Sequence, residues 1–163
     1  MYLAALIHDY DHPGVSNNFL IQTNDRLAML YNDKSILENH HCSAAFNVLI
    51  QPKNHFLESL DRKPYKLFRA NVVEMVLATD LTQHFSLLTT FKKKVNAFEW
   101  FILDWKDDRL TLMQMLMKCA DVSNPTKAWP LYQEWITRIT EEFFNQGDRE
   151  SALGLPFSPY CNR

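Results

Sequence analysis

The chain is poor in glycine, with only 3 among its 163 residues. It also lacks segments in which polar and apolar residues alternate strictly over the length of a strand, and residues that favour helices dominate instead. Because such alternation and glycine-containing turns are the sequence signals of strands and hairpins, their scarcity argues against a β-sheet. We predict an all-α fold, a compact multi-helical bundle.

An excess of charge of either sign is lacking as well. The chain has 17 basic and 19 acidic residues, so its formal net charge is -2. This balance creates no field that would attract nucleic acid or an anionic membrane, and the run Lys92 to Lys94 is typical of a solvated helix end. We therefore predict no nucleic-acid partner and no membrane partner.

Long apolar runs are absent and cysteines are few. The apolar residues 1–7 are too short a run to span a bilayer, and no basic region or small-residue cleavage site accompanies them. The chain contains 3 cysteines, an odd number, without zinc-finger spacing. Cys42 and Cys119 lie within apolar helical patterns, which predicts buried, reduced thiols and a cytoplasmic protein.

Apolar periodicity divides the chain into helical segments, without an internal repeat or an interdomain linker. Ser35 and Glu38 have the spacing of a capping box at the start of one helix, as do Asp80 and Gln83 at the start of another. Gly147 is expected to end the last helix as its C′ residue. The predicted helical segments are residues 3–9, 17–23, 26–31, 36–50, 65–79, 85–91, 108–120 and 129–146.

The segment 8–14 is the densest group of chemically useful side chains, with two histidines and two aspartates followed by Pro13 and Gly14. A histidine beside an aspartate suits a divalent cation that takes nitrogen and oxygen ligands, such as zinc, manganese or magnesium. Neighbours on a helix point about 100° apart, so one ion could use His8 and Asp9 together only near a helix end. Pro13 and Gly14 supply such an end. The alternative is a polar turn that caps a helix.

Asp121 is a second candidate ligand. It follows the pattern 108–120, which is apolar on almost every side and therefore predicts a central helix. Buried carboxylates without a partner are costly, so they become neutral or bind a cation. Ser123 to Pro125 then ends the helix.

Four further polar residues each have two possible interpretations. Glu38 is either a helix cap or a carboxylate that orients a metal-bound water or imidazole. Asp80 is either a cap or part of a site. His40 and His41 are more typical of a polar face or of a satisfied core position than of a metal site.

The motifs together resemble one family. In order along the chain they are His8-Asp9, Glu38-Asn39-His40-His41, Ala78-Thr79-Asp80 and Ala120-Asp121-Val122-Ser123-Asn124-Pro125. The sequence strongly resembles the class I 3′,5′-cyclic nucleotide phosphodiesterases, metal-dependent members of the HD hydrolase superfamily. The resemblance extends along nearly all of the chain, through residues 141–148.

The resemblance implies a compact all-helical catalytic domain that holds two divalent ions, one site usually filled by zinc and a looser one by magnesium or manganese. The implied reaction is hydrolysis of cAMP, cGMP or both to the 5′-nucleotide, by attack of a metal-activated hydroxide on phosphorus, in signal transduction. His8 and Asp121 would bind the first ion, and Asp9 would bridge both. Waters on the second ion would be held by His12, Glu38, Thr79 and Asp80, with Asn17 in the supporting shell.

The resemblance also implies a nucleotide pocket wall formed by Asn124, Trp135, Ile139 and Phe143. An asparagine at position 124 resembles the cAMP-preferring branches of the family. By contrast, residues 43–45 and 153–159 resemble the calmodulin-stimulated branch, which accepts both nucleotides. The nucleotide preference is therefore left open, and calmodulin or regulatory domains are expected only in a longer parent chain.

In the family, the leaving 3′ oxygen receives its proton from a histidine of an HNxxH motif upstream of the position of His8, and a Gln-x-x-Phe element downstream clamps the purine. The 163 residues contain neither. We expect residues 1–163 to be the central part of a single catalytic domain, with little turnover by themselves. One alternative is a truncated, catalytically incompetent isoform that binds metal or a partner, and another is a helical packing domain that binds no metal.

Overall fold

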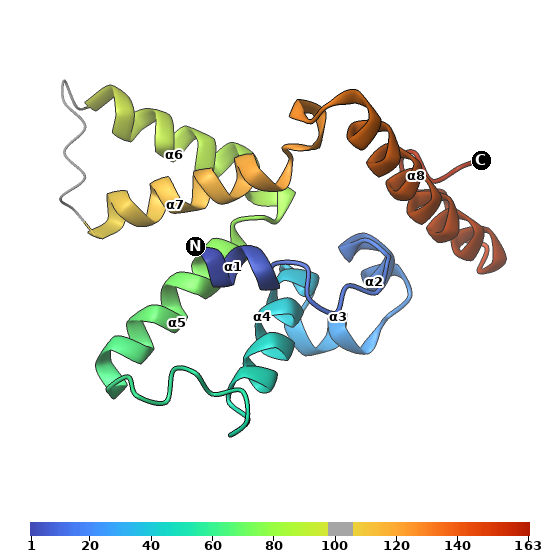
Figure 1. The fold of residues 1–163 in the computed structure, drawn as a ribbon. Helices are drawn as coiled ribbons and strands as arrows, with labels where there is room; N and C mark the ends of the chain where they lie inside the picture. Colours follow the sequence, from blue (N-terminus) through green and yellow to red (C-terminus); the bar gives the residue numbers. More distant parts are fainter. Residues whose placement is uncertain (98–105) are drawn as a thin grey trace. The chain divides into compact units, whose positions relative to one another are not determined.

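The computed structural model describes residues 1–97 and 106–163 (Figure 1). Within these ranges the secondary structure is α-helical with two short 3-10 helices and contains no strand, which confirms the predicted all-α fold. The elements are α1 (Tyr2–Ile7), α2 (Asn17–Gln22), α3 (Arg26–Tyr31), α4 (Ile36–Leu49), α5 (Arg62–Leu77), η1 (Leu81–Gln83), α6 (His84–Ala97), α7 (Lys106–Asp121), η2 (Asn124–Thr126) and α8 (Trp129–Ala152).

The chain folds as two compact units. The first unit consists of residues 1–11 and 38–121, and the second of residues 12–37 and 122–163. Each unit has an apolar core of its own.

In the first unit, α5 packs against both α1 and α7, and α6 packs against α7. On α5, Val72, Met75 and Val76 are spaced so that they share one helix face, and all three are buried. Burying each of these side chains contributes roughly 1.5–3 kcal/mol. The core formed in this way consists of Ala4, Ile7, Cys42, Ala45, Phe46, Val72, Met75, Val76 and Met117.

This packing has a direct consequence for the polar residues that follow two of the helices. α5 contacts both α1 and α7, and all three helices belong to the same unit. His8 is the C-cap of α1, and Asp121 is the last residue of α7. α1 ends at Ile7, two residues earlier than predicted, so His8 and Asp9 lie at the helix end rather than within it.

The pair α6 and α7 is tied together by Lys94, which lies in the predicted solvated run of lysines. Its ammonium group donates a hydrogen bond to the Thr111 hydroxyl at 3.0 Å and pairs with the Asp108 carboxylate at 2.8 Å. The prediction of a solvated helix end is correct for Lys92 and Lys93, which are exposed, whereas Lys94 is partly buried in these contacts.

In the second unit, α2 and α3 pack together over a core of Val15, Phe19, Leu20, Ala28, Ile36 and Leu37. Ser16 caps α2 by accepting a hydrogen bond from the Phe19 N–H at 3.2 Å. α4 starts where predicted, and Ser35, which precedes it, has φ 41°, in the left-handed region. The side-chain oxygen of Asn17 accepts a hydrogen bond from the first-turn N–H of Leu37 at 2.9 Å.

Gly147 does not end the last helix, because α8 continues to Ala152. A Cβ atom at this position would lie 1.8 Å from the carbonyl oxygen of Cys161. Glycine is therefore required for the close approach of the segment that follows α8, and it is not used as a helix stop. The prediction of a C′ glycine was wrong because the sequence does not show that backbone contact.

A buried polar cluster fixes the same segment. Glu150, which is fully buried, accepts hydrogen bonds from the Ser158 hydroxyl at 2.6 Å, the Ser158 N–H at 2.8 Å and the Gln146 amide at 2.8 Å. The side-chain oxygen of Gln146 accepts a hydrogen bond from the Ser16 N–H at 2.8 Å. The cluster therefore joins α8 to the N-terminal end of α2 and to the segment around residue 158.

The cysteine prediction is correct for Cys42 and wrong for Cys119. Cys42 is buried, and its burial raises the pKa of the thiol to about 11. Cys119 is exposed, because it faces away from the side of α7 on which Met117 is buried. Of the helices described here, none combines the length and the apolar character needed to cross a bilayer.

Candidate metal centre

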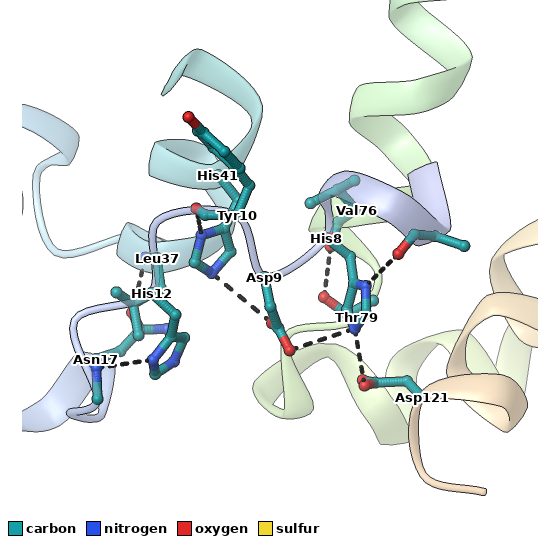
Figure 2. Close-up of polar contacts among 12 residues, drawn as sticks. His8, Asp9, Tyr10, His12, Asn17, Leu37, His41, Val76, Thr79 and Asp121 are labelled. Carbon is teal, nitrogen blue, oxygen red and sulfur yellow. Dashed lines mark hydrogen bonds and ion pairs between the residues drawn. The ribbon is translucent and has the colours of Figure 1, made fainter. Parts of the chain in front are cut away.

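Side chains from two distant parts of the sequence meet in the first unit, those of the neighbours His8 and Asp9 and that of Asp121 (Figure 2). The Nε2 atom of His8 lies 3.2 Å from Oδ1 of Asp121 and 3.3 Å from Oδ2 of Asp9. One ligand atom from each of the three residues lies within 4.8 Å of the others. Ligands about 2.1 Å from a common divalent ion are roughly 3 to 4 Å apart, and both separations from the imidazole to the carboxylates lie in this range.

The end of α1 makes this convergence geometrically feasible. His8 retains helical angles, with φ -60° and ψ -26°, and the chain turns immediately afterwards, with Asp11 at φ 61°. The Nδ1 atom of His8 donates a hydrogen bond to the carbonyl oxygen of Ala5 at 2.8 Å. This bond orients the ring so that Nε2 faces Asp9 and Asp121, as second partners of metal-binding histidines do.

The hydrogen bond to Asp121 raises the pKa of His8 to about 9, although partial burial of the ring opposes this shift. The carbonyl of Ala5 and the negative charge of Asp9 raise the pKa further. In the absence of a metal ion, this raised pKa favours the protonated His8 ring. Because a metal ligand must be a neutral imidazole, an ion that binds here would displace this proton.

The structure changes the reason for regarding Asp121 as a ligand. Its side chain is 28% exposed, so the prediction of a buried carboxylate at the end of an apolar helix was wrong. Its pairing with His8 is what makes it a candidate. The end of α7 lies at the surface of the first unit, where a carboxylate costs little and an ion has access.

His41 is a buried residue that contacts the segment carrying Asp9, a role that the sequence did not identify. The ring is 1% exposed, which confirms the interpretation of a satisfied core position. Its Nδ1 donates a hydrogen bond to the carbonyl of Tyr10 at 2.6 Å, and its Nε2 lies 3.9 Å from Oδ1 of Asp9 (Figure 2). His40, one residue earlier, pairs with Asp11 at 2.8 Å. The two histidines thus contact the turn that carries Asp9.

Thr79 and Asp80 lie in the turn between α5 and η1, and both are buried. The Thr79 hydroxyl donates to the carbonyl of Val76 at 2.7 Å. The Asp80 carboxylate accepts from the N–H of Thr82 at 2.8 Å, which confirms its role as a cap. Lys118 of α7 donates hydrogen bonds to the carbonyls of Ala78 and Asp80, on either side of Thr79. The sequence did not point to this residue.

Glu38 lies in the first turn of α4 and is half-buried. Its carboxylate acts electrostatically on Cys42 and on Lys118. The first unit therefore contains His8, Asp9, Glu38, Thr79, Asp80 and Asp121 among the predicted metal-site residues.

The other predicted site residues belong to the second unit. The Nδ1 atom of His12 accepts a hydrogen bond from the N–H of Gly14 at 3.0 Å, and Asn17 caps α4 as described above. The predicted nucleotide-wall residues of α8 form an exposed apolar stripe; Trp135, Ile139 and Phe143 are 51%, 42% and 37% exposed. Participation of these residues in a site with His8, Asp9 and Asp121 stays a prediction.

Residues 1–163 match the family model described as 3′5′-cyclic nucleotide phosphodiesterase. The chain belongs to this phosphodiesterase family. The family resemblance carried by the His8-Asp9, Thr79-Asp80 and Asp121 motifs is thereby confirmed.

Individual relatives of this phosphodiesterase chain agree with the family match. It is 46% identical over 163 residues to "Probable 3′,5′-cyclic phosphodiesterase pde-3" of Caenorhabditis elegans, covering 100% of the chain and 24% of that protein. It is 48% identical over 165 residues to "3′,5′-cyclic-AMP phosphodiesterase 4C" of Rattus norvegicus, covering 98% of the chain and 31% of that protein. The chain thus spans about a quarter to a third of the length of these relatives.

Solved structures confirm the predicted fold type. The crystal structure of the phosphodiesterase domain of Salpingoeca rosetta rhodopsin phosphodiesterase is similar with a TM-score of 0.91 and 34% sequence identity. The similarity covers 99% of this phosphodiesterase chain and 51% of that chain. The predicted multi-helical bundle of the phosphodiesterase type is therefore correct.

Proposed function

We propose that the protein hydrolyses 3′,5′-cyclic nucleotides to 5′-nucleotides in a reaction that requires divalent metal, and that it acts in cyclic-nucleotide signal transduction in the cytoplasm. The observation that supports this most directly is the meeting of His8, Asp9 and Asp121 within 4.8 Å, in a chain that belongs to the phosphodiesterase family. We propose further that residues 1–163 form the central part of a single catalytic domain, since they cover 51% of the solved phosphodiesterase domain chain.

The proposed metal centre holds two ions, zinc in the tighter site and magnesium or manganese in the other. His8, Asp9 and Asp121 would hold the first ion, and Asp9 would be shared with the second. When bound, such ions lower the pKa of water and offset the negative charge that develops on phosphoryl oxygens. The residues proposed to act on water around the second ion are His12, Asn17, Glu38, Thr79 and Asp80.

The protein's own groups prepare this centre. Ala5 fixes the His8 ring through Nδ1, so that Nε2 is directed at the carboxylates. The buried His41 places its Nε2 atom 3.9 Å from Oδ1 of Asp9. The Thr79 hydroxyl donates its proton to Val76, so its oxygen can serve the site only as an acceptor.

For the nucleotide, we propose a wall formed by Asn124, Trp135, Ile139 and Phe143. The three α8 side chains offer an exposed apolar surface suited to a purine ring. The Oδ1 atom of Asn124 is buried and has no hydrogen-bond partner among the described residues, which is costly. An exocyclic amine, such as that of adenine, would satisfy this acceptor and supports cAMP as a substrate, with cGMP to be tested beside it.

Hydrolysis also requires a proton for the leaving 3′ oxygen. The family resemblance gives this role to a histidine of an HNxxH motif, which does not occur within the 163 residues. Metal binding can therefore be tested on the 163-residue chain. Hydrolysis has to be tested on the complete protein. A metal-binding or interaction module without turnover is the alternative function.

The decisive experiment compares Asp121→Asn with Asp108→Asn, a matched substitution in the same helix at a carboxylate that pairs with Lys94. Divalent metal content and Mn²⁺ affinity are measured on the 163-residue chain, and hydrolysis of cAMP and cGMP on the complete protein with added Mg²⁺ or Mn²⁺. We expect Asp121→Asn to weaken metal binding by at least about tenfold and to abolish hydrolysis, while Asp108→Asn retains both. Metal-bound protein without hydrolysis would favour the alternative, and equal metal binding by both variants would refute the proposed centre.

A further inference from the structure

Lys118 is an unusual residue for its position. It lies on α7 three residues before Asp121, within an apolar pattern, and is only 5% exposed. A buried ammonium group costs free energy unless hydrogen bonds compensate for the water that it loses. Its position in the helix would otherwise suit a methionine or leucine, so its contacts must explain its presence.

Those contacts are with the turn that carries Thr79 and Asp80. The Nζ atom of Lys118 donates hydrogen bonds to the carbonyl of Ala78 at 2.8 Å and to the carbonyl of Asp80 at 3.4 Å. The two acceptors flank Thr79 on the backbone. Lys118 therefore holds both sides of the turn from a different helix.

Two further hydrogen bonds of this turn are local. Thr79 bonds to Val76, three residues before it, and Asp80 bonds to Thr82, two residues after it. Local bonds of this kind shape the turn but do not fix its position relative to α7. The Lys118 bonds reach across 40 and 38 residues of sequence and supply that connection.

Lys118 also lies in the field of the acidic groups of the site. Burial lowers the pKa of its ammonium group, while the charges of Asp121, Asp80 and Glu38 act in the opposite direction. A positive charge in this place repels a divalent ion. If Lys118 acted through its charge alone, its removal would therefore strengthen metal binding, which is the opposite of what a positioning role requires.

We propose that Lys118 is a positioning residue of the metal centre, which ties the turn of residues 78–80 to α7 and so holds Thr79 and Asp80 in place relative to Asp121. This inference rests on the proposed metal-dependent function. It adds a residue that touches neither the ligand cluster nor the proposed nucleotide wall. Its effect passes through two backbone carbonyls and the rigid helix α7.

The test compares Lys118→Met with Lys94→Met in the 163-residue chain. Lys94 is a matched control, because it also connects α7 to another helix of the first unit, through Thr111 and Asp108. Mn²⁺ affinity is measured by calorimetry and by electron paramagnetic resonance, and stability by urea unfolding. We expect Lys118→Met to bind Mn²⁺ about tenfold or more weakly, as other losses of supporting contacts do, and Lys94→Met to bind it within about twofold of the unsubstituted chain.

Two further variants complete the test. Lys118→Arg retains the charge and the donors, and we expect it to bind Mn²⁺ within about threefold of the unsubstituted chain. Lys118→Gln is used if Lys118→Met does not fold, with an expected loss of several-fold. Binding by Lys118→Met, or in its place Lys118→Gln, that is unchanged or tighter overturns the positioning role, as does an equal loss in Lys94→Met.

The same measurements separate this inference from the proposed function. If the unsubstituted chain binds Mn²⁺, loses it on Asp121→Asn and keeps it on Lys118→Met, the metal centre stands and the role of Lys118 fails. If the unsubstituted chain binds no Mn²⁺, the proposed metal centre fails and the role of Lys118 fails with it.

Discussion

The Nε2 atom of His8 and the Oδ1 atom of Asp121 lie 3.2 Å apart although 113 residues separate them in the sequence. The packing of α5 against both α1 and α7 brings the two residues together, since each lies at the C-terminal end of one of those helices. A charge-assisted hydrogen bond joins them when His8 is protonated. Four predictions concern this pair, its support and the second unit.

Metal binding should stabilise the first unit. Because an ion that binds only the folded state adds RT ln(1 + [M]/Kd) to its stability, Mn²⁺ at 100 times its Kd should add about 2.7 kcal/mol. Asp9→Asn should abolish this gain, since Asp9 supplies one of the three ligand atoms. Thermal unfolding with and without Mn²⁺ measures the effect, and Asp61→Asn, a substitution at the N-cap of α5, serves as the control. A gain of the same size in Asp9→Asn would contradict the prediction.

His41→Leu should weaken Mn²⁺ binding by about tenfold, because it removes the group that lies against Asp9. It should also destabilise the fold by about 1–3 kcal/mol, because the carbonyl of Tyr10 loses its buried donor. Calorimetric titration with Mn²⁺ and urea unfolding measure the two effects. His55→Leu, outside the metal centre, is the control; a similar loss of Mn²⁺ binding in that variant would show that the effect is not specific to His41.

The Glu150 cluster should make stability depend on pH below about 4.5. Burial by itself raises the pKa of Glu150, but the hydrogen bonds from Ser158 and Gln146 outweigh it, and the pKa is lowered from its ordinary value of 4.5. A lowered pKa in the folded state means that this stabilisation is present above the ordinary value and is lost as the pH falls through the folded value.

Glu150→Gln should therefore remove this part of the acid sensitivity. At pH 7 it should cost about 1–3 kcal/mol, because the donors of Ser158 lose a charged acceptor. Urea unfolding from pH 7 to pH 3 measures the free energy of unfolding of the unsubstituted chain and of Glu150→Gln. If the difference between them persists unchanged at pH 3, the carboxylate is not the source of the effect.

Gly147→Ala should destabilise the second unit by about 1–3 kcal/mol or more. Alanine is the better helix former, by up to about 1 kcal/mol, but its Cβ atom would lie 1.8 Å from the carbonyl oxygen of Cys161. Ser151→Ala, at an exposed position of the same helix, is the control and should change stability little. Denaturant unfolding measures the free energy of unfolding of both variants. A Gly147→Ala variant that is more stable than the unsubstituted chain would mean that the segment around Cys161 moves away without loss of stability.

Much of the fold could be predicted from the sequence, because helix periodicity and capping residues act locally. The helices at 26–31 and 36–49 start where their patterns indicate, and Asp80 caps η1 as its spacing with Gln83 suggests. α5 begins at Arg62, three residues before the predicted start, since Pro64 is tolerated within the first turn, where its missing N–H has no intrahelical partner. The motif residues also identified the family.

The sequence by itself determined the helical class, the candidate ligands and the resemblance, because these depend on residue type and short spacing. Only the tertiary structure decided which side chains meet. Apolar periodicity predicts which face of a helix is buried, but it does not predict which other helix packs against that face. The pairing of His8 with Asp121, the support of Asp9 by His41 and the reach of Lys118 to the turn at 78–80 all depend on contacts between segments far apart in the chain, and helix packing alone brings those segments together.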